Sequence, residues 1–185
     1  MGCPFSTSNE TPYVMTKQQF IEGMDAWSSH LPLLWEALEA TQGEVIELGI
    51  GNGSTPKLHE YCKEKKRSLF SYENNIDWYR KFEHLRTSTH AIEYTQDWLE
   101  PIQRHRYTIG VVFSDEAPGF IRKYNIAMFS QNAQVIIAHD TEDKSEHGYL
   151  FSLVSPLFKS KKSIILDGIG TTAFSNFIDV TKWSV

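Results

Sequence analysis

The pattern of hydrophobic and polar residues divides the chain into helices followed by alternating strands and helices. Apolar side chains recur at helical spacing in Lys17–Ser28, and a second helix is expected after Pro32, ending near Gly43. The expected strands are Val45–Leu48, Ser68–Tyr72, Ala91–Tyr94, Tyr107–Phe113, Gln134–Ala138, Ser163–Leu166 and Thr172–Ile178. The expected helices between them are Pro56–Lys66, Ile76–Leu85, 119–130 and roughly 146–158.

Strands that alternate with helices predict an α/β fold with right-handed crossovers and helices on both faces of the sheet. The last two strands are joined by a short turn containing Gly168 and Gly170, so they pair antiparallel as a hairpin. The expected fold is therefore Rossmann-like, a mostly parallel seven-stranded sheet with an antiparallel last strand. We expect one domain over 16–185, in which the helices at 16–42 are placed to form a lid, after a flexible tail over 1–15.

The composition is typical of a globular protein. The chain has 185 residues, of which 41% are hydrophobic, and its net charge of -5 gives no reason to expect nucleic acid as a partner. No apolar run reaches the roughly 20 residues that cross a bilayer, and two cysteines suit a reducing compartment, so we expect a cytoplasmic protein. Met1–Ser6 matches a myristoylation pattern, and membrane association is expected only if Gly2 and Cys3 are lipidated. The sequence leaves open whether the protein forms a homodimer.

A glycine-rich loop follows the first strand directly. Gly49, Gly51 and Gly53 permit a tight turn and a close approach of the backbone to a ligand. The dinucleotide-binding fingerprint expects glycine or alanine where this chain has Ser54, and a P-loop would need a lysine after a glycine. Glu47, two residues before the first glycine, would repel a pyrophosphate and attract a cationic ligand, directly or through water.

Acidic residues follow the next two strands. Glu73 ends the second strand, at the edge where open α/β sheets bind ligands, and can accept hydrogen bonds from both hydroxyls of a ribose; capping of the next helix is the alternative. Asp97 follows the third strand and can accept from an adenine amino group. Trp98 beside it either covers the base or lies in the core.

The loop, the acid after the second strand and the final hairpin together resemble the class I S-adenosylmethionine-dependent methyltransferase family, from about Lys17 onward. The resemblance implies S-adenosylmethionine as cofactor and S-adenosylhomocysteine as product. It also implies that the loop backbone faces the methionine portion and that Glu73 binds the ribose. The candidate cofactor-binding residues are Glu47, Gly49, Gly51, Asn52, Gly53, Ser54, Thr55, Glu73, Asn74, Asp97, Trp98 and Ser114.

The fourth and fifth strands end next to the candidate catalytic residues Asp115, His139 and Asp140, for which three roles stay open. His139 is a candidate general base, oriented by one of the aspartates. The three side chains could instead chelate a divalent ion, but metal-dependent relatives usually have Asp and then Asp-Asn, so no metal is expected. Finally, the aspartates could cap helices and His139 could be a paired polar residue.

The remaining histidines and one arginine have a lower priority. Arg122 either binds an anionic acceptor or forms a salt bridge with Asp115 or Glu116. The other histidines lack ligand spacing, and most of them are expected at the surface or on helices: His30, His59, His84, His90, His105 and His147.

The function that these features favour is transfer of a methyl group from S-adenosylmethionine to a small molecule, with oxygen as the receiving atom. A small acceptor is expected because the sequence has no inserted substrate domain. The alternative is a protein that binds S-adenosylmethionine without catalysis, as a partner or scaffold. A nicotinamide-linked oxidoreductase is disfavoured by Ser54 and by the final hairpin.

Overall fold

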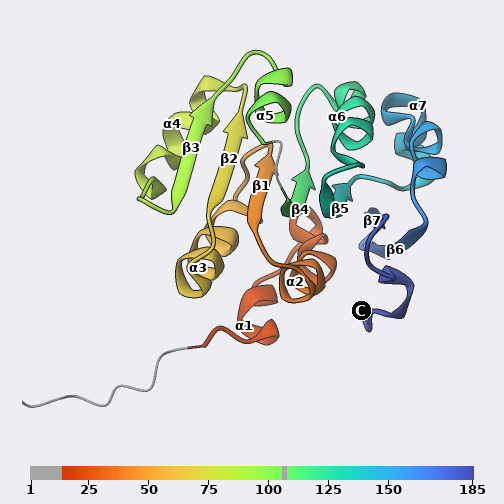
Figure 1. The fold of residues 1–185 in the computed structure, drawn as a ribbon, viewed down its shortest axis with the longest axis horizontal. Coiled ribbons are helices and arrows are strands. Elements are labelled where there is room, and N and C mark those ends of the chain that lie inside the picture. The colour runs from red at the N-terminus through yellow and green to blue at the C-terminus, as the bar shows by residue number, and fades with distance from the viewer. Residues whose placement is uncertain (1–13, 106–107) are drawn as a thin grey trace, which may run out of the picture.

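The structure, a computed structural model, describes residues 14–105 and 108–185. Its centre is a seven-stranded sheet in the order β3-β2-β1-β4-β5-β7-β6 (Figure 1). The first five strands are parallel, whereas β7 runs antiparallel to both β5 and β6. The predicted fold class is confirmed. The strands are β1 Glu44–Leu48, β2 Leu69–Glu73, β3 His90–Tyr94, β4 Ile109–Ser114, β5 Ala133–His139, β6 Ser160–Leu166 and β7 Ile169–Ser175.

Helices cover both faces of the sheet (Figure 1). Successive strand residues point to opposite faces, so Val45 and Val111 pack against α2 and α3, while Ile46 and Val112 pack toward α6. The α-helices are α1 Lys17–Ile21, α2 Leu31–Ala40, α3 Thr55–Lys65, α4 Ile76–Phe82, α5 Leu99–Arg104, α6 Arg122–Phe129 and α7 Glu146–Tyr149.

Two expected helices are interrupted in the structure. The helix expected over 17–28 ends at Ile21, because Gly23 has a left-handed backbone with a φ of 74°, and a short 3₁₀ turn follows at Ala26–Ser28. The helix expected over 146–158 ends at Tyr149, where Leu150 has a φ of 56°. Two 3₁₀ turns continue from there, at Phe151–Leu153 and Ser155–Leu157.

Two further elements differ from the sequence prediction. The helix α5 was not predicted, and its Pro101 lies in the first turn, where the missing N–H does not break the helix. The final hairpin turns at Asp167 and Gly168, with φ values of 51° and 79°, the mirror-image turn that two-residue hairpins favour. β6 begins earlier than expected, and β7 begins and ends earlier than expected.

Some sequence predictions fall outside the part of the chain that the structure describes. These are most of the tail, including Gly2 and Cys3, and the start of the fourth expected strand at Tyr107. Within the described part, no helix has the length and apolar character that crossing a membrane requires.

The buried guanidinium of Arg67 joins the helical layer to the sheet. It donates to the carbonyl oxygens of Leu38 at 2.8 Å and Gly43 at 2.9 Å, and so holds the end of α2 beside the start of β1. The bond to Leu38 is buried, where an unpaired acceptor is costly.

We expect Arg67→Met to lower the free energy of unfolding by about 3 kcal/mol, because the substitution leaves these carbonyls without donors. Urea denaturation measures the change. The control Lys63→Met, at an exposed position of α3, should change stability by less than about 0.5 kcal/mol. Equal stability of the two variants would contradict the role of Arg67.

Candidate active site

Two adjoining cavities lie at the carboxyl ends of the central strands. The smaller, of about 460 Å³, is lined by Gly49, Glu73 and Asn74 among others. The larger, of about 630 Å³, is bounded by the glycine loop, the segment before α2, and the ends of β4 and β5. Ile50, Trp78 and Asp115 line both. This edge of the sheet is where open α/β folds bind ligands.

The glycine loop requires glycine at two places for steric reasons. Gly49 has a φ of 87°, and a Cβ there would lie 2.7 Å from the backbone carbonyl of Asp115. At Gly53 a Cβ would lie 2.9 Å from the Cβ of Ser28. The loop is therefore packed between the end of β4 and the segment before α2.

Glu73 projects from the end of β2 to the wall of the smaller cavity. Its carboxylate accepts hydrogen bonds from the backbone N–H groups of Ile50 at 2.8 Å and Asn75 at 2.6 Å. Burial raises the pKa of Glu73, against these two hydrogen bonds. The same carboxylate thus anchors the loop and presents an acceptor to the cavity.

Glu47 lies beneath the loop, fully buried, and lines neither cavity. Its carboxylate accepts hydrogen bonds from the hydroxyls of Ser54 at 2.6 Å, Thr55 at 2.9 Å and Ser71 at 2.5 Å. Thr55 Oγ1 in turn accepts from the N–H of Gly51 at 3.0 Å. Glu47 supports the loop from below.

The other predicted cofactor residues divide between the cavity walls and positions away from them. Asp97 accepts from the N–H of Leu99 at the start of α5, and the buried Trp98 donates to the carbonyl of Ala117. The residues that line a cavity are Gly49, Gly51, Asn52, Gly53, Ser54, Glu73 and Asn74. Those that line neither are Glu47, Thr55, Asp97, Trp98 and Ser114.

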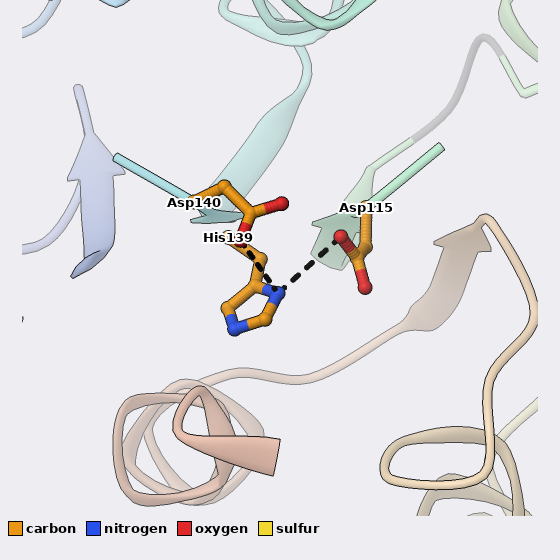
Figure 2. Close-up of side chains that lie close together, drawn as sticks. All are labelled: Asp115, His139 and Asp140. Atoms are coloured by element: carbon orange, nitrogen blue, oxygen red, sulfur yellow. Dashed lines mark hydrogen bonds and ion pairs between the residues drawn. The ribbon is translucent and has the colours of Figure 1, made fainter. Parts of the chain in front are cut away.

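The three candidate catalytic residues lie together at the ends of β4 and β5 (Figure 2). The distances from His139 Nδ1 are 3.3 Å to Asp115 Oδ1 and 3.7 Å to Asp140 Oδ1. Arg122 binds both carboxylates, each at 3.0 Å, so its salt bridge to Asp115 is confirmed. The three residues could supply metal ligands within 4.8 Å of one another. However, the guanidinium already provides the positive charge that a cation would bring, so the donor set does not favour a metal.

No protein-family model and no curated protein sequence matches the chain. Solved structures do match. One is a caffeoyl-CoA O-methyltransferase, assigned provisionally, from Staphylococcus aureus, with a TM-score of 0.59 and 10% identity over 82% of this chain and 84% of that one. Another is human methyltransferase-like protein 13 in complex with SAH, with a TM-score of 0.57 and 15% identity over 81% and 78%. A third is EvdMO1, with a TM-score of 0.51 and 12% identity over 77% of this chain and 39% of that one.

The chain has the class I methyltransferase fold. In this methyltransferase fold, the strand order and the reversed β7 bring the loop, Glu73 and the Asp115–His139–Asp140 cluster to one edge of the sheet.

Both ring nitrogens of His139 have hydrogen-bond partners in this methyltransferase fold. Nε2 lies 3.0 Å from the hydroxyl of Ser29, and Nδ1 faces Asp115. Burial opposes the charged form, but the hydrogen bond and the negative charge of Asp115 outweigh it and raise the pKa of His139. The connectivity is that of a Ser–His–Asp triad, but Ser29 is buried and lines neither cavity, so it is not a nucleophile open to substrate.

The sequence predicts most of the remaining histidines at the surface or on helices. His59 lies on α3, although it is buried, whereas His30, His90 and His105 are buried outside the helices, so the expectation is wrong for these three. The rings of His59 and His90 are joined by a hydrogen bond of 2.9 Å, and His90 Nε2 reaches the hydroxyl of Ser71, which donates to Glu47. The sequence contained one signal that His90 would be buried, because this residue begins a strand that pairs with the buried strand β2.

The buried Glu47 should make the stability of the protein depend on pH. Burial raises its pKa to about 7 from 4.5. Between these values the unfolded chain releases a proton that the folded protein keeps. The free energy of unfolding should therefore fall by about 3 kcal/mol from Glu47 alone as the pH rises through this interval, and level off above it. Urea titrations of wild type and Glu47→Gln should differ in this slope. Exposed Glu60→Gln serves as the control and should keep the wild-type slope.

Proposed function

We propose that this chain binds S-adenosylmethionine across the two cavities and transfers its methyl group to an oxygen atom of a small acceptor. The observation that carries the proposal is the carboxylate of Glu73 at the wall of the smaller cavity, beside Gly49 and Ile50. A carboxylate there can accept from two ribose hydroxyls. The methionine portion would then lie along Gly51–Ser54 in the larger cavity.

The shape and charge of the site support this assignment. Where the cavities join, Asp115 offers a negative charge near the expected position of the sulfonium. The similar structures include one in complex with SAH and one named as an O-methyltransferase. Methyl transfer needs an in-line approach of the acceptor, which the segment before α2 can enforce by closing the larger cavity.

For the Asp115–His139–Asp140 cluster we propose the role of an oriented base. The two carboxylates fix the ring of His139, which lines the larger cavity, and an acceptor hydroxyl in that cavity would pass its proton to the imidazole. The oxygen would form a bond to the methyl carbon, and the carbon–sulfur bond would break with its electron pair left on sulfur. The products are a methyl ether or ester and S-adenosylhomocysteine.

Glu73→Ala should weaken the binding of S-adenosylhomocysteine about 50-fold, because two hydrogen bonds to the ribose are lost. Isothermal calorimetry measures the dissociation constant. The control Asp77→Ala, an exposed acid on α4, should leave it unchanged. Unchanged affinity of a folded Glu73→Ala variant would remove Glu73 from the ribose site. Absence of binding by the wild type would refute the proposal.

His139→Ala should lower the turnover number about 100-fold or more while the affinity for S-adenosylhomocysteine stays within about twofold. Turnover is measured as transfer of an isotopic methyl label from S-adenosylmethionine to the small molecules of a cell extract. Wild-type turnover should rise with pH through the raised pKa of His139, since the base must be deprotonated. Full activity of the variant would exclude the base, and cofactor binding without any transfer by the wild type would favour the non-catalytic alternative.

A further inference from the structure

His30 is the N-cap residue of α2, at the wall of the larger cavity. Its side chain is buried, with 1% of the residue exposed. Neither ring nitrogen has a hydrogen-bond partner among the residues that the structure describes. A buried polar atom without a partner costs about 1–3 kcal/mol, and such atoms in native proteins often belong to functional sites.

The other buried histidines in the described part of the chain are paired. His105 bonds Tyr72 at 2.8 Å and Glu44 at 2.9 Å, and His90 bonds His59 and Ser71, each at 2.9 Å. His30 instead lies against Phe113, with ring centroids 4.4 Å apart, and meets His139 edge-on at 4.8 Å. The fold therefore holds the ring of His30 in place and leaves its nitrogens for a ligand.

Its surroundings keep His30 uncharged. Burial and the neighbouring His139 lower the pKa of His30 to about 3, although Asp115 and Asp25 act in the opposite direction. At neutral pH the ring thus offers one N–H donor and one bare nitrogen. This pair complements a hydroxyl group, which both donates and accepts.

The charges of the larger cavity restrict what can bind beside His30. Its wall contains the acids Glu22, Asp25, Asp115 and Asp140. Both cationic side chains on this wall are already bound. Lys57 donates to the carbonyl oxygens of Gln19 and Glu22, and Arg122 pairs with Asp115 and Asp140. The four carboxylates outnumber the two cationic side chains on this wall, so an anionic acceptor beside Asp115 and Asp140 would meet net negative charge.

The apolar part of the wall favours a ring. Trp27 is 77% exposed and Trp78 is 37% exposed, and both line the cavity. Indole rings that remain open to solvent in a protein surface offer large faces for stacking.

We propose that His30 is the acceptor-binding residue, and that the acceptor is a small hydroxyl compound without anionic groups whose oxygen pairs with the His30 ring and whose ring packs against Trp27. This inference rests on the proposed methyl transfer and deepens it. His139 would take the proton, while His30 would hold the oxygen and orient its lone pair.

The first test observes His30 directly. Protein labelled with ¹⁵N-histidine, with and without S-adenosylhomocysteine, is titrated with phenol, and His30→Phe assigns the ring resonances. Phenol should shift the bare nitrogen of His30, and 4-hydroxybenzoate, which adds a carboxylate, should shift it at least tenfold less at equal concentration. No response to phenol, or an equal response to 4-hydroxybenzoate, would overturn the inference. Calorimetry with S-adenosylhomocysteine tests the proposed function separately, so the two failures are distinguishable.

The second test uses the unpaired nitrogens themselves. His30→Phe should raise or preserve the melting temperature, keep the affinity for S-adenosylhomocysteine within about twofold and lower methyl transfer at least 30-fold, equivalent to about 2 kcal/mol. The matched control His105→Phe removes a paired buried histidine and should lower the melting temperature. A His30→Phe variant with wild-type transfer, or one destabilised as much as His105→Phe, would refute the role of His30.

Discussion

The close approach of Gly49 to the backbone of Asp115 is the constraint on which the site depends. β1 and β4 are neighbours in the sheet, with Leu48 opposite Ser114, so the chains that leave them run side by side. Because Gly49 has no Cβ, its backbone can lie against the carbonyl of Asp115. This contact fixes the glycine loop beside the Asp115–His139–Asp140 cluster, and so fixes where a cofactor methyl group would meet an acceptor.

Charge balance explains the composition of the wall behind this contact. Arg122 donates to the backbone carbonyls of Glu116 and His139 and bridges Asp115 to Asp140. Glu116 is buried beside it, and burial raises the pKa of this carboxyl. A single guanidinium thus serves several acceptors, which leaves it poorly suited to bind an anionic substrate as well. The acidic character of the cavity comes from Glu22 and Asp25, which lie on the same wall and add negative charge to this paired cluster.

The fold and the position of the site could be predicted from local patterns, whereas the depth of individual side chains could not. The β1–glycine loop and Glu73 follow from strand alternation and from the rule that ligands bind at strand carboxyl ends. Strand parity also places Glu47 on the face of Val45, under α3, but the three hydroxyls that cover it come from the glycine loop, α3 and β2. The break at Gly23 depends on a single left-handed residue within an otherwise helical pattern. Such facts arise from tertiary packing.

The same limit explains why His30 had a low priority from the sequence alone and why its contact with His139 matters. The two rings come from segments over 100 residues apart and meet at 4.8 Å. Asp115 and Asp140 favour a proton on His139, and a positive charge there disfavours a second one on His30. The site can therefore keep one imidazole whose pKa is raised next to one that stays uncharged. An acceptor hydroxyl between the two rings would have a base on one side and a neutral hydrogen-bonding partner on the other. Methylation of an oxygen uses both, because the base removes the proton and the partner holds the oxygen.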